Sequence, residues 1–254
     1  MKVYRKKKFS FVRFILLLII IGCLIFLGKR GFDYYNNIKN NNNKKEIVEK
    51  AENDVLQKDP NADLEKRKKA ILESFQKENP EVIAYLEVLG TSINYPVLKP
   101  QNNQFYMRRG LNKEYDIGGS IFIEAKNNKD LNDDNTVIYG HHLEIGGAMF
   151  TDLEKFRNQE FAQGHRKIRL TTNEGMREYE IFTVYGIPSV NDYRTLQFAD
   201  KKDKVKYFDI MKSRSEVKLD SKDLTEDDTI ITLVTCEYDY EDQRLVVQAY
   251  RKDK

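Results

Sequence analysis

The sequence is poor in the residues that build disulfide scaffolds and metal sites. It has two cysteines, three histidines and no tryptophan among 254 residues. Cys23 lies inside a long apolar run and Cys236 lies near the C-terminus, so we do not expect them to pair. This excludes a disulfide-stapled fold and a zinc site of several thiolates. One cysteine remains outside the apolar run, either as a small buried hydrophobe or as a nucleophile.

Acidic residues are absent from the first 30 positions, which hold eight basic ones. The rest of the chain has 35 basic and 40 acidic residues, so the net charge of +3 divides into +8 and −5. A body with an acidic excess lacks the basic face that neutralises phosphates, and we therefore expect no nucleic-acid partner. The eight basic residues are Lys2, Arg5, Lys6, Lys7, Lys8, Arg13, Lys29 and Arg30.

Charged residues are also absent from Phe14–Leu27, the centre of the apolar segment Phe9–Gly28. A helix needs about 20 residues to span a bilayer, which this segment supplies. A cleaved signal peptide is the alternative, but no small-x-small cleavage site follows the run. The preceding basic cluster places the N-terminus in the cytoplasm and residues 31–254 outside. We therefore predict an uncleaved, single-pass anchor that binds the lipid membrane.

The segment after the anchor is polar and low in complexity. Asn36–Lys45 contains six asparagines and is predicted to form a stalk. Lys44–Gln57 and Ala62–Lys77 are rich in helix-forming residues, and the second has apolar residues at helical spacing. Asn79-Pro80 ends this second helix. We expect one or two amphipathic helices before the main domain.

From Val82 onward, short β-rich runs replace the helical pattern. Their number predicts a mainly β fold of about eight strands, either a closed barrel or a sandwich. A helical spacing over Leu196–Arg214 predicts a helix inserted before the last two strands. The predicted strands are Ala84–Leu89, Tyr95–Leu98, Ser120–Glu124, Thr136–Tyr139, Lys167–Thr171, Arg177–Ile187, Thr229–Thr235 and Arg244–Tyr250.

Three reactive side-chain types fall at the ends of these strands. Cys236 follows one strand, Arg244 opens the next after a polar turn, and His141 follows a third strand by one glycine. Strand ends can converge on one rim while the sheet holds them rigid. A thiolate is a strong nucleophile, an imidazole transfers protons, and a guanidinium stabilises an oxyanion. The combination predicts acyl transfer through a thioester, with no metal and no cofactor.

Each of these residues also has a purely structural interpretation. A lone cysteine at a strand end commonly packs in a core, and a histidine in a loop is commonly solvated. An arginine in a hairpin commonly pairs with a nearby carboxylate, for which Glu237, Asp239, Glu241 and Asp242 are candidates. The combination favours chemistry, because a free thiol outside the membrane is open to oxidation.

The motifs around these residues resemble class B of the sortase family, in the same order over about residues 61–254. The resemblance rests on TLVTC (Thr232–Cys236) with Arg244, VIYGHH (Val137–His142), GGAMFTDLEKF (Gly146–Phe156), YLEVLGTSINYPVL (Tyr85–Leu98) and GGSIFIE (Gly118–Glu124). It implies a sortase-like eight-stranded β-barrel with N-terminal helices, located on the outer face of a Gram-positive-type cell. It also implies a division into a cytoplasmic tail (1–8), an anchor (9–28), a stalk with partial helix (29–60) and a catalytic domain (61–254).

The resemblance assigns a role to each candidate residue. Cys236 corresponds to the nucleophile that attacks the Thr carbonyl of a C-terminal sorting signal. His141 corresponds to the histidine that protonates the leaving amine and deprotonates the incoming one, and Arg244 to the arginine that holds substrate and oxyanion. The implied partners are surface proteins with NPQTN-like or PPxTG-like signals. The implied acceptor is an amine of the peptidoglycan precursor or cross-bridge, or less often a pilin lysine.

The chain departs from the family pattern at two positions. Val234 stands where the family often has serine, and Tyr85 stands where the opening strand usually has tryptophan; both bear on substrate details. Among the other candidates, His142 is interpreted as a neighbour and His165 as a solvated residue. The acidic run Asp130–Asp134 has no recognised calcium-loop spacing and is interpreted as a solvated turn.

Three other functions remain open from the residues themselves. A papain-type cysteine hydrolase requires a cysteine at a helix start, and an L,D-transpeptidase usually has a histidine shortly before its cysteine. Neither pattern is present around Cys236. A non-catalytic, membrane-tethered surface domain is the third alternative, in which Cys236 is buried and unreactive.

Overall fold

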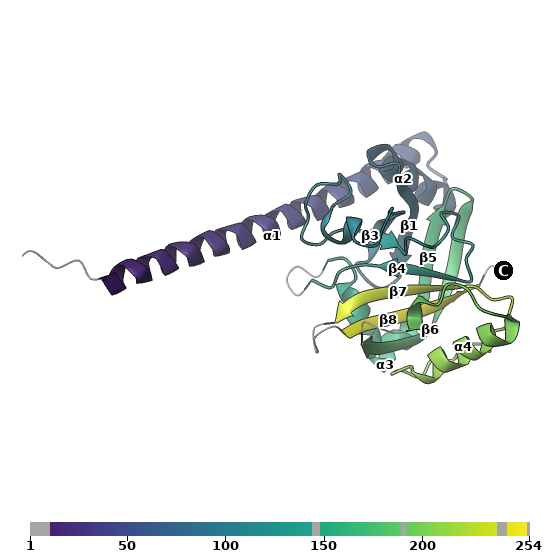
Figure 1. The fold of residues 1–254 in the computed structure, drawn as a ribbon. Helices are drawn as coiled ribbons and strands as arrows, with labels where there is room; N and C mark the ends of the chain where they lie inside the picture. The colour runs from purple at the N-terminus through teal and green to yellow at the C-terminus, as the bar shows by residue number, and fades with distance from the viewer. Residues whose placement is uncertain (1–10, 144–147, 189–191, 238–242, 253–254) are drawn as a thin grey trace, which may run out of the picture.

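The computed structural model describes residues 11–143, 148–188, 192–237 and 243–252. Within these ranges eight strands close into a barrel in the order β1-β2-β3-β4-β7-β8-β6-β5. Helices precede the barrel, and a helix is inserted before its last two strands, as predicted (Figure 1). The strands are β1 (Val82–Val88), β2 (Asn94–Leu98), β3 (Ile121–Ile123), β4 (Asn135–Tyr139), β5 (Lys167–Thr172), β6 (Gly175–Pro188), β7 (Ile230–Glu237) and β8 (Gln243–Arg251).

The barrel has two parallel joints, β2 with β3 and β4 with β7, and its other joints are antiparallel. The joint between β4 and β7 brings two strands that are far apart in sequence side by side, with Tyr139 opposite Val234. Because parallel strands end at the same edge of a sheet, the residues that follow β4 lie next to the end of β7. This pairing determines where a site can form.

Alternating strand positions divide the apolar core into two clusters. On β8, Leu245, Val247 and Ala249 belong to one cluster, whereas Val246 and Tyr250 belong to the other. This follows from the two-residue period of a strand, which directs successive side chains to opposite faces. The first cluster fills the barrel. The second covers its outer wall beneath the flanking helices.

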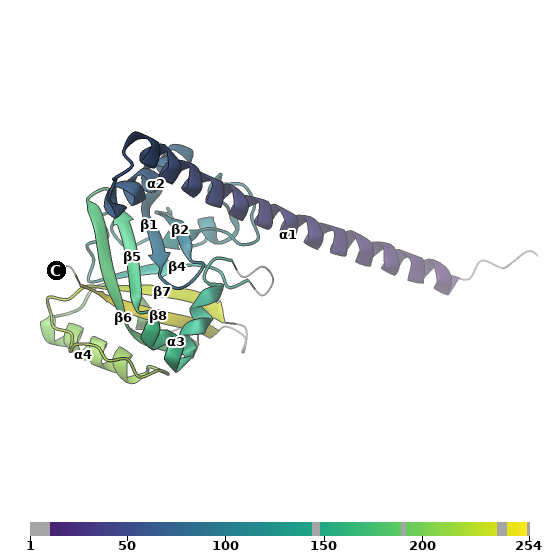
Figure 2. The same cartoon turned by 180° about the vertical axis from the view of Figure 1, so that it is seen from behind.

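Helix α2 (Leu64–Glu78) covers the outer wall near β1 and β5 (Figure 2). Its first turn is capped by Asp63, whose carboxylate accepts from the Lys66 amide at 2.8 Å. Its apolar residues Ile71, Leu72 and Phe75 are fully buried. The helical spacing of the sequence therefore predicted this helix within two residues at each end.

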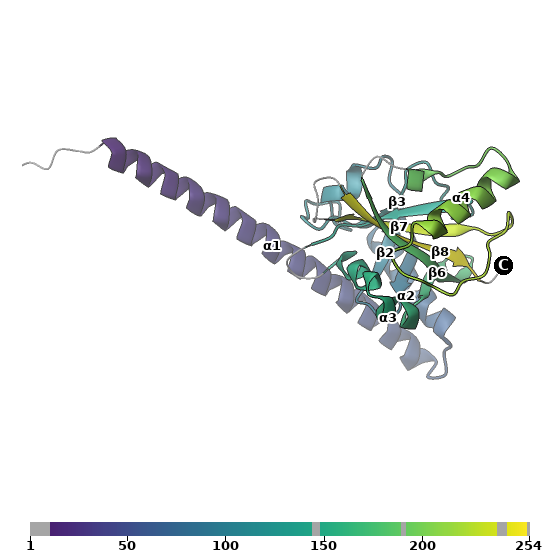
Figure 3. The same cartoon turned by 90° about the horizontal axis from the view of Figure 1, so that it is seen from below.

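The inserted helix α4 (Lys201–Ser213) lies over the other side of the barrel, against β6 and β8 (Figure 3). Thr183 of β6 donates its hydroxyl to the Met211 carbonyl at 2.9 Å, and Gln248 of β8 donates to the Tyr207 hydroxyl at 3.0 Å. The remaining elements are short: η1 (Phe105–Arg108), η2 (Thr151–Arg157), α3 (Gln159–Gly164) and η3 (Asp192–Arg194).

The N-terminal part is more continuously helical than the expected stalk with partial helix. A single helix, α1 (Phe11–Lys58), runs through both without a break. Among the described residues, α1 is the one helix long and apolar enough to cross a membrane, and its apolar window is fully exposed. The asparagine-rich segment is helical because side chains such as Asn37 bind the body, which local composition cannot indicate.

Two smaller expectations are also settled by the structure. His165 is not solvated: it is half-buried, and its ring stacks on Phe161 with 4.2 Å between centroids. The acidic run is a surface turn in which Asp134 pairs with Lys204 and Asp133 accepts from Asn128. No group of His, Cys, Asp or Glu side chains suited to a metal ion occurs in the described parts of the chain.

Candidate active site

A pocket of about 240 Å³ lies on the outer wall of the barrel, at the ends of β4 and β7. It contains two of the three predicted site residues, His141 and Arg244. The lining residues are Asn103, Gln104, Met107, Phe122, Tyr139, Gly140, His141, Arg194, Val234 and Arg244. Segments from six parts of the sequence therefore meet here, and each positions a different group.

His141 is placed by the parallel joint of β4 and β7. The Gly140 amide donates to the Val234 carbonyl at 3.1 Å, which extends the strand pairing by one residue. A Cβ at Gly140 would lie 2.5 Å from Ile121 Cδ1 and 2.7 Å from the Phe150 ring. Glycine is therefore required for the chain to pass between these side chains and bring His141 to the pocket.

The His141 ring is held by the backbone of η1. Its Nε2 lies 2.6 Å from the Met107 carbonyl oxygen, which can only accept, so Nε2 carries the proton and donates. The pKa of His141 is lowered, first by burial and then by the nearby Arg108 and Arg244 guanidiniums; the Met107 carbonyl and Asp116 oppose this. Near neutral pH the ring is therefore neutral, with Nδ1 as its acceptor nitrogen.

Cys236 and Arg244 are paired across the last hairpin. They are direct partners in the antiparallel register of β7 and β8, one residue beyond the pair Thr235 and Leu245. Arg244 is half-buried and lines the pocket. Cys236 is placed by its backbone; its side chain and those of Glu237, Asp239, Glu241 and Asp242 lie outside the described parts of the structure.

One wall of the pocket is a hydrogen-bonded network around a buried carboxylate. Glu124 accepts from Asn103 Nδ2 at 2.7 Å and from the Tyr139 hydroxyl at 2.8 Å. Burial, and then the bond to Glu124, raise the pKa of Tyr139, so its hydroxyl remains protonated. The Arg194 guanidinium lies 5.9 Å from the centre of the Tyr139 ring. This network gives the pocket a rigid polar wall.

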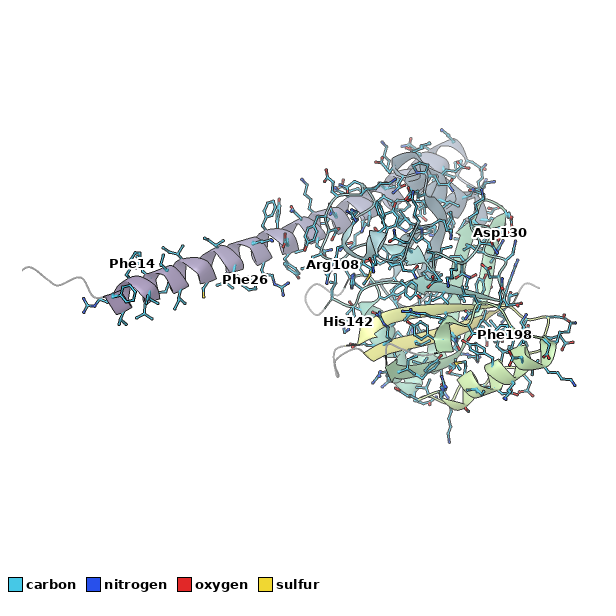
Figure 4. The ribbon with its side chains drawn as sticks, viewed as in Figure 1. Phe14, Phe26, Arg108, Asp130, His142 and Phe198 are labelled. Atoms are coloured by element: carbon cyan, nitrogen blue, oxygen red, sulfur yellow. The ribbon has the colours of Figure 1, made fainter. Side chains whose placement is uncertain are left out.

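Sequence reasoning missed Met107, Asn103 and Arg194. All three come from irregular segments or short 3-10 turns, where no periodicity singles out a residue. His142, interpreted as a neighbour, is buried outside the pocket lining, with Nδ1 3.4 Å from Glu154 Oε1; Figure 4 labels its position. Val234 lines the pocket as an apolar side chain.

Comparisons with known proteins give one consistent result. The family model of the sortase domain matches residues 86–252. Sortase B of Listeria monocytogenes is 31% identical over 246 residues, covering 94% of this chain and 96% of that protein. The structure of Clostridium perfringens sortase B aligns with a TM-score of 0.66 at 33% identity, covering 71% of this chain and 99% of that one. A Staphylococcus aureus sortase B–substrate complex aligns with a TM-score of 0.75 at 27% identity, covering 86% and 98%.

Proposed function

Because the chain belongs to the sortase family and is a class B cysteine transpeptidase, we propose that it anchors surface proteins by cleaving their C-terminal sorting signals. The bond cleaved is the one after Thr in an NPQTN-like or PPxTG-like signal. The acyl group passes through a thioester on Cys236 to an amine of the peptidoglycan precursor or cross-bridge. The observation that supports this most directly is the register of β7 and β8, which opposes Cys236 to Arg244 beside the pocket that holds His141.

Each of the three residues has one task in the proposed reaction. The Cys236 thiolate adds to the Thr carbonyl carbon, and the Arg244 guanidinium donates to the oxygen that becomes negative. When the C–N bond breaks, His141 as imidazolium gives its proton to the leaving amine. An incoming amine then attacks the thioester, neutral His141 takes the amine proton, and the thiolate leaves.

Every second strand position lies on one face, so position 236 belongs to the face of β7 that carries Val234.

The proposed location is the outer face of a cell membrane, with the N-terminus in the cytoplasm. The apolar half of α1 is exposed and is preceded by a basic cluster, as the positive-inside rule requires. In this arrangement the division of the chain is a tail (1–8), an anchor (9–28), a connecting segment (29–60) and the catalytic domain (61–254).

Mass spectrometry of residues 31–254 with a library of LPxTG-, NPQTN- and PPxTG-like peptides tests the proposal. We expect a covalent adduct on Cys236 that is absent in Cys236→Ala, and release of the acyl group to an added amine. A folded protein that forms no adduct with any peptide would disprove the transpeptidase mechanism.

Paired variants test the individual roles. His141→Ala removes the proton carrier and should abolish turnover, whereas His142→Ala should retain it, because His142 lies outside the pocket lining. Arg244→Lys should lose at least about tenfold, since a point charge cannot reproduce the planar fork of a guanidinium. If His142→Ala abolished turnover and His141→Ala retained it, His142 would be the base. Near-normal turnover of Arg244→Lys would show that Arg244 has a structural role.

A further inference from the structure

The anchor helix and the catalytic body form one continuous structure. Helix α1 has 48 residues and contains no proline, and its N-terminal half stands clear of the body while its C-terminal half lies against it (Figures 1 and 2). Its three glycines, at 22, 28 and 31, have open space around them. An uninterrupted helix keeps its two ends at a fixed separation and orientation, whereas a flexible linker does not.

Two asparagines of α1 bind a single buried carboxylate of the body. Asn37 Nδ2 donates to Asp116 Oδ1 at 2.7 Å, and Asn40 Nδ2 donates to Asp116 Oδ2 at 2.8 Å. Asn37 is 3% exposed and Asp116 is 1% exposed. Hydrogen bonds to a buried ionised carboxylate are strong and costly to lose. We call Asn37, Asn40 and Asp116 the clamp.

The clamp is directly connected to the rim of the pocket. The Asp116 amide donates to the Arg108 carbonyl at 3.1 Å, and the Gly119 amide donates to the Asp116 carbonyl at 3.0 Å. Gly119 has a φ of +58°, and a Cβ there would lie 2.5 Å from the carbonyl oxygen of Met107. Met107 in turn holds the His141 ring. Backbone contacts among Met107, Arg108, Asp116 and Gly119 therefore connect α1 to His141.

The ends of β4 and β7, beside which the pocket lies, are on the side of the body toward the apolar end of α1 (Figure 1). In Figure 4, Arg108 and His142, the sequence neighbours of the lining residues Met107 and His141, lie on this side, whereas Asp130 and Phe198 lie on the far side. Ten residues separate Leu27, at the end of the uncharged run, from Asn37 of the clamp. At 1.5 Å per residue this is about 15 Å. An α1 that spans the bilayer thus places the side of the body that carries the pocket close above the membrane surface.

We propose that α1 is a rigid strut that holds the pocket at a set height above the bilayer, so that the enzyme selects membrane-held substrates by the distance between signal and membrane. The inference rests on the proposed function and adds a length requirement to it: the scissile bond of the membrane-held substrate must lie a short, set length outside the bilayer. Extended chain covers about 3.4 Å per residue, so about 15 Å corresponds to a spacer of about four or five residues.

The test uses the full chain in vesicles of phosphatidylglycerol and phosphatidylcholine. The substrates carry the NPQTN- or PPxTG-like signal cleaved best in detergent, followed by spacers of 1–15 residues and a membrane-spanning helix. A soluble peptide with the same signal serves as the reference. We expect the ratio of membrane-held to soluble turnover to peak at a short spacer and to fall about tenfold at the longest, because the effective concentration depends on reach.

A seven-residue helical insertion between Gly31 and Phe32 supplies the decisive variant. It raises the body by about 10 Å and keeps nearly the same face toward the substrate, because seven residues are close to two turns. The optimum should move to spacers about three residues longer, while soluble turnover stays unchanged. Asn37→Ala with Asn40→Ala should flatten the optimum. The control pair, Asn42→Ala with Asn43→Ala, changes exposed asparagines for which no hydrogen bond occurs in the described residues and should keep it.

The outcomes separate this inference from the proposed function. Absence of turnover on every peptide, soluble or membrane-held, contradicts the proposed function. Turnover that does not depend on spacer length, or an optimum that the insertion leaves in place, overturns the strut. A sharp, unmoved optimum in the variant lacking both clamp asparagines overturns the role of the clamp.

Discussion

At the scale of single residues, His141 shows how the body shifts the pKa of the proposed proton carrier. Burial and two arginines lower its pKa, whereas the Met107 carbonyl and the Asp116 carboxylate raise it. The balance keeps the ring neutral at neutral pH, which suits removal of a proton from an incoming amine. In the proposed reaction the preceding step, in which the leaving amine takes a proton from His141, is disfavoured, because the imidazolium that donates this proton is the minor form of the ring.

Arg108→Gln tests this balance. The Arg108 side chain is exposed and donates to the Ile117 carbonyl at 2.6 Å, and after burial its charge is the largest cause of the lowered pKa of His141. Removing a nearby cation stabilises the imidazolium, so the pKa of His141 should rise toward its ordinary value. An NMR titration of the His141 ring measures the shift, and the acid limb of turnover should move to higher pH with it.

Arg109→Gln is the matched control, because the Arg109 guanidinium lies over the Phe105 ring at 4.6 Å and is not among the charges that act on His141. An unmoved titration in Arg108→Gln, or equal shifts in both variants, would contradict this electrostatic interpretation.

At the scale of elements, α1 combines residues with poor helix propensity and a buried lysine. Lys44 is 6% exposed, and its Nζ lies 3.4 Å from Asn41 Oδ1 and 5.7 Å from the centre of the Tyr95 ring. Burial lowers the pKa of Lys44, and the Asp116 carboxylate opposes this. Neutral partners do not repay the loss of water around an ammonium. The burial of Lys44 is therefore unfavourable, and the other contacts of α1 hold the helix against the body.

We expect Lys44→Met to raise the free energy of unfolding of residues 31–254. Methionine is a flexible apolar side chain that occupies the space without the desolvation cost. The folded pKa lies below the unfolded one, so the penalty is complete below the folded pKa and disappears as the pH rises from the folded to the unfolded pKa of Lys44. The gain should therefore shrink at alkaline pH in urea unfolding. The exposed neighbour provides the control: Lys45→Met should have little effect, and a Lys44→Met variant less stable than the parent would contradict the prediction.

At the scale of the whole molecule, the outer core extends beyond the barrel to the C-terminal half of α1. Ala51 is buried in the same cluster as Ile71, Leu72 and Phe75 of α2, with Ile47 and Val48 packed against it. Lys68 of α2 also pairs with Glu52 at 3.1 Å. The packed body thus includes the C-terminal half of α1.

A comparison of the fragments 31–254 and 61–254 measures this contribution. The shorter fragment exposes the apolar residues of α2 and lacks the clamp, so we expect it to be less stable by about 2–5 kcal/mol, the cost of losing several buried apolar contacts and buried hydrogen bonds. Urea unfolding of both fragments gives the difference. Equal midpoints would show that α1 adds nothing to the body.

The strands and the order of the motifs were predictable because they follow from local patterns. Two-residue alternation and turn residues located all eight strands within a few positions, and the three candidate residues fall at their ends. The partners of these residues were not predictable. Met107 contributes a backbone carbonyl, and Asn103 and Arg194 come from irregular segments with no pattern of their own.

The sequence by itself determined the apolar N-terminal segment, the eight strands, the helix before the last two and the single thiol of the body. Each of these depends on composition or on a period of two or 3.6 residues. Only the tertiary structure decided that the asparagine-rich segment is a docked helix and where the pocket forms. The first depends on Asp116, which lies 79 residues beyond Asn37, and the second on the pairing of β4 with β7; contacts over such separations leave no periodic trace in the sequence.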